Sequence, residues 1–181
     1  MSVEGDQHVQ TPEGEDEDAM GAGSTKETLG LTPAEKRILK STWNSVRKDL
    51  GKNGIALFTI FLRDYPNHAV YFKHFKDTTQ EGLKIDPIVK IHGIRVLREV
   101  SLIVDNLENP ETVLLMLRQN AQKHKVHKIS RKAYEDLSLS FVKMVENHMG
   151  EEKVSAEARA TWTKALKIIF TVIVDLSREE T

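Results

Sequence analysis

The chain has 181 residues, of which 39% are hydrophobic and 29% charged, so it is long enough to bury a sizeable hydrophobic core. It has no cysteine, which excludes disulfide bonds, thiolate metal sites, iron–sulfur clusters and thiol nucleophiles. The net charge is −1, and basic residues beyond position 30 are interspersed with acidic ones, so we expect no nucleic-acid partner. The longest apolar run, residues 168–174, is too short to span a bilayer, and no signal-like segment begins the chain, so we expect a cytoplasmic protein that does not contact a membrane.

Residues 1–30 differ in composition from the rest of the chain. They hold eight acidic residues and one lysine, a charge of −7, and they lack hydrophobic periodicity. We therefore predict a disordered acidic N-terminal extension over residues 1–30 and one folded domain over residues 31–181.

The first two helices have clear start and stop signals. Thr32 is a helix cap, and Glu35, three residues later, completes a capping box. We expect Gly51 to end this first helix. A second helix, apolar on most sides, is predicted over residues 52–65, and Pro66 stops it.

The remaining elements are also predicted to be helical. A short aromatic piece over residues 67–76 is followed by a flexible run over residues 77–84, then by a long helix over residues 85–107. Further helices begin after Asn109, Ser130 and Ser155, each of which can cap a helix. Because period-two alternation is absent, we predict an all-α domain of six or seven helices.

His92 is a polar residue within an apolar stripe of the helix at residues 85–107. It shares one helix face with Val89, Val96 and Val100, at steps of three and four residues. A lone inward histidine can be a core residue hydrogen-bonded to a backbone carbonyl, or it can be a ligand at a buried cofactor. A second inward histidine on another helix favours the ligand.

His124 supplies that second histidine. It ends a stripe formed by Val113, Leu117 and Ala121 on the helix that starts after Asn109. Two imidazoles on separate helices can hold one flat cofactor in an apolar pocket, as for iron in a porphyrin, where one imidazole is an axial ligand and the other either ligates or donates a hydrogen bond to a bound gas. A zinc site is an alternative, but the sequence offers no third and fourth ligand at suitable spacing.

Several motifs together give the chain a family resemblance. Pro66 is followed six residues later by Phe72, and Phe75 occupies the next aromatic position. His92-Gly93-Ile94-Arg95-Val96 and the lead-in Asn106-Leu107-Glu108-Asn109-Pro110, followed by His124, complete the pattern. Residues 31–181 resemble a globin, and the likeness is to animal globins of the cytoglobin and neuroglobin kind. The resemblance implies the globin fold, in which helices A, B, C, E, F, G and H surround a haem pocket.

The resemblance also implies roles for individual residues. His124 would be the proximal iron ligand and His92 the distal residue, with His127 as a rival for the proximal role. Arg95 would meet a haem propionate, although a solvated surface arginine is an equal alternative. Gly54 and Gly93 occupy the positions where the B and E helices of globins cross closely. The apolar residues expected to surround haem b are Phe58, Phe72, Val96 and Leu117.

The function that follows is reversible binding of dioxygen, carbon monoxide or nitric oxide, and oxygen transport would be one use of it. The resemblance implies that His92 can itself bind iron when no gas is present, which gives a bis-histidyl, six-coordinate form. Whether the chain is an enzyme stays open. The alternatives are a redox globin, such as a nitric oxide dioxygenase served by an external reductase, a gas or redox sensor, and a haem-free interaction module. A homodimer is also open.

Overall fold

A computed structural model of the chain describes residues 28–72 and 79–178. Seven α-helices and four short 3-10 helices make up this part, and it holds no strand, so the all-α prediction is confirmed there. Nearly all of the predicted extension, and Phe75, lie outside the described residues. The elements are η1 (Thr28–Gly30), α1 (Pro33–Val46), η2 (Arg47–Asp49), α2 (Leu50–Asp64), η3 (Pro66–Tyr71), α3 (Gln80–Ile85), α4 (Pro87–Asp105), α5 (Pro110–Lys125), α6 (Arg131–Met149), η4 (Glu151–Lys153) and α7 (Ala156–Leu176).

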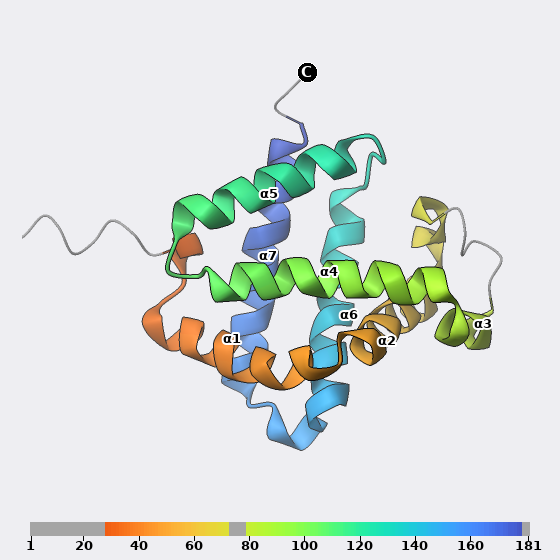
Figure 1. The fold of residues 1–181 in the computed structure, drawn as a ribbon, viewed down its shortest axis with the longest axis horizontal. Helices are drawn as coiled ribbons and strands as arrows, with labels where there is room; N and C mark the ends of the chain where they lie inside the picture. The colour runs from red at the N-terminus through yellow and green to blue at the C-terminus, as the bar shows by residue number, and fades with distance from the viewer. Residues whose placement is uncertain (1–27, 73–78, 179–181) are drawn as a thin grey trace, which may run out of the picture.

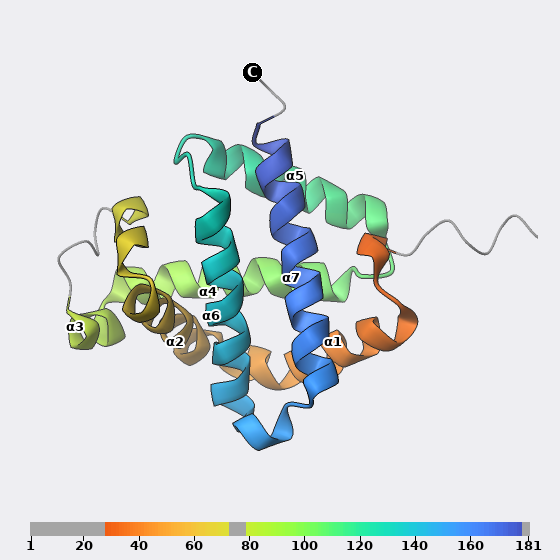
Figure 2. The ribbon, with the colours of Figure 1, turned by 180° about the vertical axis from the view of Figure 1, so that it is seen from behind.

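The helices form layers that cross one another. Helices α6 and α7 run side by side, and α4 crosses over both of them (Figures 1 and 2). Helices α1 and α2 lie across one end of this pair, and α5 lies across the other end. Where α1, α6 and α7 meet, the ring of Trp43 lies 5.7 Å from that of Phe141 and 5.6 Å from that of Trp162. All three side chains are almost fully buried, so this aromatic cluster joins the layers in the core.

Several helix ends lie where the local chemistry predicted them. The Thr32 hydroxyl accepts a hydrogen bond from the Glu35 backbone N–H at 3.2 Å, and the Glu35 carboxylate accepts one from the Thr32 N–H at 2.8 Å. Ser130 and Ser155 cap α6 and α7 in the same way through their hydroxyl groups. Gly150 follows α6 with a φ of 89°, a conformation that favours glycine.

Removing the Thr32 hydroxyl should weaken the start of α1. We expect Thr32→Ala to lower the free energy of unfolding by about 1 kcal/mol, because the first turn then loses its side-chain acceptor. Urea denaturation followed by circular dichroism measures this change. Ser41→Ala is the matched control. The exposed Ser41 hydroxyl donates to the Ile38 carbonyl of the same helix, so we expect its loss to change the free energy of unfolding by less than about 0.5 kcal/mol. Equal losses in the two variants would contradict the role assigned to the cap.

Two local predictions were wrong. Gly51 does not end the first helix: α1 ends at Val46, and the carboxylate of Asp49 caps α2 by accepting from Lys52. The flexible run predicted for residues 77–84 contains the start of helix α3, which Thr79 caps through the N–H of Gly82. Residues 77 and 78 of that run lie outside the described part of the chain.

Helices α2 and α4 touch backbone to backbone. A Cβ atom added at Gly93 would lie 2.5 Å from the carbonyl carbon of Gly54, and one added at Gly54 would lie 2.6 Å from that of Gly93. Contacts this short leave no room for any side chain, so the close crossing expected from these two glycines is confirmed. The crossing fixes the position of Phe58, one turn after Gly54, relative to His92, which precedes Gly93.

No helix within the described residues is long and apolar enough to cross a membrane.

Candidate functional site

A cavity of about 600 Å³ lies between α2, η3 and α4 on one side and the end of α5 and start of α6 on the other. Its walls are mostly aromatic and aliphatic, with three histidines and one arginine among them. The lining residues are Phe58, Phe61, Tyr71, Phe72, Ile88, Ile91, His92, Arg95, Val96, His124, His127, Ile129, Ala133, Tyr134 and Leu137.

His92 lines the cavity from the middle of α4. Its ring centroid lies 4.8 Å from that of Phe58 and 5.6 Å from that of Phe72, so two aromatic rings hold the imidazole. Burial, together with the nearby His124, Arg95 and His127, lowers the pKa of His92 to about 4, and burial is the largest of these causes. The ring is therefore uncharged at neutral pH. No described residue forms a hydrogen bond with it, which argues against the alternative of a core histidine bonded to a carbonyl.

His124 lines the same cavity from the last turn of α5. Its Nδ1 lies 2.9 Å from the backbone carbonyl oxygen of Asn120, one turn earlier, and because a carbonyl only accepts, Nδ1 donates this hydrogen bond. In the neutral ring Nε2 then carries the lone pair, which is the form that binds a metal. The helix backbone thus fixes both the tautomer and the orientation of the imidazole.

Phe58, Phe72, Val96 and Arg95 also lie at the cavity, as the sequence predicted. The rings of Phe58 and Phe72 lie 5.5 Å apart in an edge-to-face arrangement and form a wall beside His92. Val96 follows His92 by one turn of α4, while Arg95 is exposed at the cavity edge. Because the Arg95 side chain is accessible to solvent there, its position is compatible with either of its two predicted roles.

Leu117 is the one residue of the predicted set that is not among those lining the cavity. It is 1% exposed and packs in the hydrophobic core, but it does not line the cavity. Leu117 lies seven residues before His124, which is about 10 Å along a helix axis. The stripe on α5 therefore faces the core over most of its length and reaches the cavity at its last turn.

Other lining residues were not predicted as part of the site. Ile88 and Ile91 stand on the same face of α4 as Arg95, and their helical spacing could have indicated this. They are 44% and 49% exposed, so they form part of the rim. Tyr134 forms part of the wall near the start of α6, and burial raises the pKa of its hydroxyl to about 12.

The donor set fits haem better than a bare metal ion. Among the described residues, no group of three or more histidine, aspartate or glutamate side chains is arranged to hold a metal. A cavity of about 600 Å³ with aromatic walls suits a flat apolar cofactor, and imidazoles from two helices are axial partners that haem iron accepts. The hydrogen bond from His124 Nδ1 to the Asn120 carbonyl leaves Nε2 as the nitrogen that can coordinate a metal, as is typical of ligand histidines.

Comparison with known proteins gives the class. The globin family profile matches residues 55–173, more than half of the chain. A globin of Nerita albicilla is 26% identical over 143 residues, which cover 79% of this chain and 90% of that protein. Cytoglobin-2 of Oryzias latipes is 29% identical over 77% of this chain and 79% of its own, and cytoglobin-1 of Danio rerio is 22% identical over 83% and 87%.

The all-helical fold, with a cavity lined by histidines of α4 and α5, is that of a helical protein with room for a cofactor. The chain belongs to the globin family, and it is a haem-binding globin.

Proposed function

We propose that this globin holds haem b between His124 and His92 and binds a diatomic gas reversibly on the His92 side. The observation that carries the proposal is the state of the two imidazoles. Both line one apolar cavity, His124 has its Nδ1 bound to a backbone carbonyl, and burial keeps His92 uncharged. Haem iron supplies the coordination bonds to histidine and to gas.

Each residue around the cavity has a proposed role in binding haem or in limiting access to it. His124 is the proposed proximal ligand, and the Asn120 carbonyl orients it. Phe72 and Phe58 exclude water on the distal side, and Val96 limits the space beside His92. Arg95, exposed at the rim, is the proposed partner of a haem propionate, because a guanidinium pairs well with a carboxylate.

One set of optical spectra tests the proposal. Purified protein should show a Soret band in the ferric, ferrous and carbonmonoxy forms, and dioxygen should bind to and leave the ferrous form without net oxidation. A preparation that carries no pigment, even after addition of haem, would overturn it.

The resting coordination gives a separate prediction. We propose that His92 occupies the sixth position in the absence of gas, because its ring is neutral and has no hydrogen-bond partner among the described residues. The ferrous protein without gas should then show sharp, split alpha and beta bands. His92→Leu should convert them to one broad band, because leucine cannot coordinate iron. Val96→Ala keeps the imidazole and should keep the split bands. A broad band in the unmodified protein would contradict the six-coordinate form.

The redox alternative needs a supply of electrons, whereas gas storage or transport does not. A nitric oxide dioxygenase consumes nitric oxide over many turnovers when a reductase is supplied, whereas a simple oxygen binder consumes about one equivalent per oxygenated haem and then stops as ferric haem. Steady-state nitric oxide consumption therefore discriminates between them. The lack of cysteine fits a reducing compartment, and we propose the cytoplasm as the location.

A further inference from the structure

The 3-10 helix η3 leads directly into Phe72, the ring that contacts His92. It is six residues long, whereas 3-10 helices seldom exceed three or four residues because their hydrogen bonds are poorly aligned. No side chain caps its start. A segment of this kind depends on tertiary contacts to hold its position, and α6 supplies them.

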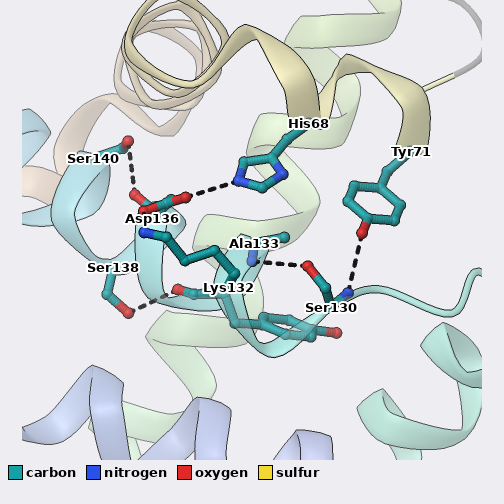
Figure 3. A network of polar contacts seen from close by, with 9 residues as sticks. His68, Tyr71, Ser130, Lys132, Ala133, Asp136, Ser138 and Ser140 are labelled. Atoms are coloured by element: carbon teal, nitrogen blue, oxygen red, sulfur yellow. Dashed lines mark hydrogen bonds and ion pairs between the residues drawn. The ribbon is translucent and has the colours of Figure 1, made fainter.

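Asp136 of α6 makes the central contact (Figure 3). Its Oδ2 atom accepts a hydrogen bond from Nε2 of His68, on η3, at 2.8 Å, and the two side chains are only 4% and 13% exposed. Lys132 pairs with the other carboxylate oxygen. Burial acts to raise the pKa of Asp136, but the hydrogen bonds from Lys132 and His68 outweigh burial and leave this pKa below its usual value. The carboxylate is therefore charged at neutral pH and is a strong acceptor.

His68, held by Asp136, in turn contacts the wall of the cavity. Its ring stacks on that of Phe61, with centroids 5.3 Å apart and planes 10° apart. Phe61 lines the cavity and lies 6.4 Å from Phe72, whose ring lies 5.6 Å from that of His92. A continuous series of contacts thus joins the buried carboxylate on α6 to the distal histidine on α4.

A second hydrogen bond supports the same segment. The Tyr71 hydroxyl oxygen accepts from the backbone N–H of Ser130 at 3.2 Å, at the start of α6 (Figure 3). Ser130 in turn caps α6 through the Ala133 N–H. The middle of η3, at His68, and its last residue, Tyr71, are therefore both held by the start of α6, a short distance after the proposed proximal histidine in the chain.

We propose that Asp136 is a positioning residue for the distal side: by holding His68 it keeps η3 and Phe72 in place against His92, and it thereby limits how fast gas reaches the iron. This rests on the proposed function. Without the carboxylate, η3 loses its buried tether and Phe72 restrains His92 less. His92 then moves away from the iron more often, and gas binds faster.

Two measurements on Asp136→Ala test the proposal. Carbon monoxide binding to the ferrous protein, followed by stopped flow, should become about fivefold faster, the effect expected from losing one ordinary hydrogen bond. Hydrogen exchange should show loss of protection at the Phe72 N–H, which donates to the Ala69 carbonyl at 2.9 Å. Exchange requires no bound gas, and it can also be measured without haem. It therefore tests the positioning role even if the proposed function fails.

A conservative substitution at Asp136 and a double substitution make the test more specific. Asp136→Asn keeps an oxygen that accepts from His68, so its rate and its exchange protection should return close to those of the unmodified protein. His68→Ala combined with Asp136→Ala should change the rate no more than either substitution alone, because the two side chains act as one unit. Additive effects of the two alanine substitutions would overturn the proposal.

Two further variants serve as matched controls. Lys132→Met removes the exposed partner of Asp136 but leaves the bond to His68, so the rate should not change. Asp64→Asn weakens the 2.9 Å ion pair from Asp64 to Lys143, another contact between α6 and the rest of the fold, and the pair with Arg63, but it leaves the contact between His68 and Asp136 in place. Asp136→Ala and Asp64→Asn can both lower the melting temperature. If Asp136→Ala does so but leaves the carbon monoxide binding rate and the hydrogen exchange of the Phe72 N–H unchanged, Asp136 has only a structural role and the proposal is wrong.

Discussion

Replacing His124 with alanine should give a helical protein that no longer retains its haem. His124 is the imidazole whose Nδ1 the Asn120 carbonyl already holds, so its other nitrogen is prepared to coordinate iron. Loss of an outer-shell partner typically weakens metal binding by roughly 10- to 100-fold, and loss of the ligand itself should exceed this range. The side chain is only partly buried, at the last turn of α5, so the fold should survive the change.

The measurement is the haem-to-protein ratio after transfer to an excess of a haem-accepting apoprotein. External imidazole should restore pigment to the His124→Ala protein, because it fills the space left by the side chain and supplies the missing nitrogen. His127→Ala is the matched control: His127 lines the same cavity three residues later, is exposed, and should be dispensable. If His127→Ala loses haem and His124→Ala retains it, the proximal assignment is wrong.

The second large effect is expected at the crossing of α2 and α4. We expect Gly93→Ala to destabilise the protein by about 3 kcal/mol, because the new Cβ would lie 2.5 to 2.6 Å from three backbone atoms of Gly54. Backbone atoms cannot rotate away, so the helices must separate. The gain in helix propensity, about 1 kcal/mol, offsets only part of this cost. Urea denaturation of the haem-free protein, followed by circular dichroism, measures the loss.

Gly51→Ala is the matched control on α2. There the nearest atom to an added Cβ is the Lys90 Cε at 3.2 Å, the end of a flexible side chain that can move aside. This substitution should be neutral or stabilise the protein by up to about 1 kcal/mol. Similar behaviour of the two variants would show that the crossing tolerates a side chain, contrary to the structure.

Local signals predicted most of the helices, because caps and stops depend on chemistry within one turn. Thr32, Ser130 and Ser155 each bond an N–H within their own helix start, and such bonds can be read from sequence. Gly51 misled the prediction, since a glycine after an apolar stripe commonly ends a helix; here it lies in the first turn of α2 with an ordinary φ. The short helix α3 was missed because Leu83 is its one buried residue.

The site was predictable only as far as helix faces allow. The apolar residues recur at helical spacing on α4 and α5, and this spacing places His92 and His124 on the inward faces. In the structure both histidines line the same cavity. The depth of that space depends on how helices cross, so the sequence could not show that Leu117 lies outside the cavity lining. The bond from His68 to Asp136 joins residues 68 positions apart, and no local pattern indicates it.

The contact between Gly54 and Gly93 has a consequence for gas access. No side chain separates α2 from α4 at that point, so the two helices have nothing compressible between them and must move as one body. Phe58 and His92 lie on these two helices, so widening the gap between α2 and α4 would be a costly route to the cavity. If the protein binds gas as proposed, we expect entry when the His92 imidazole rotates about its own side-chain bonds or when the segment that holds Phe72 moves.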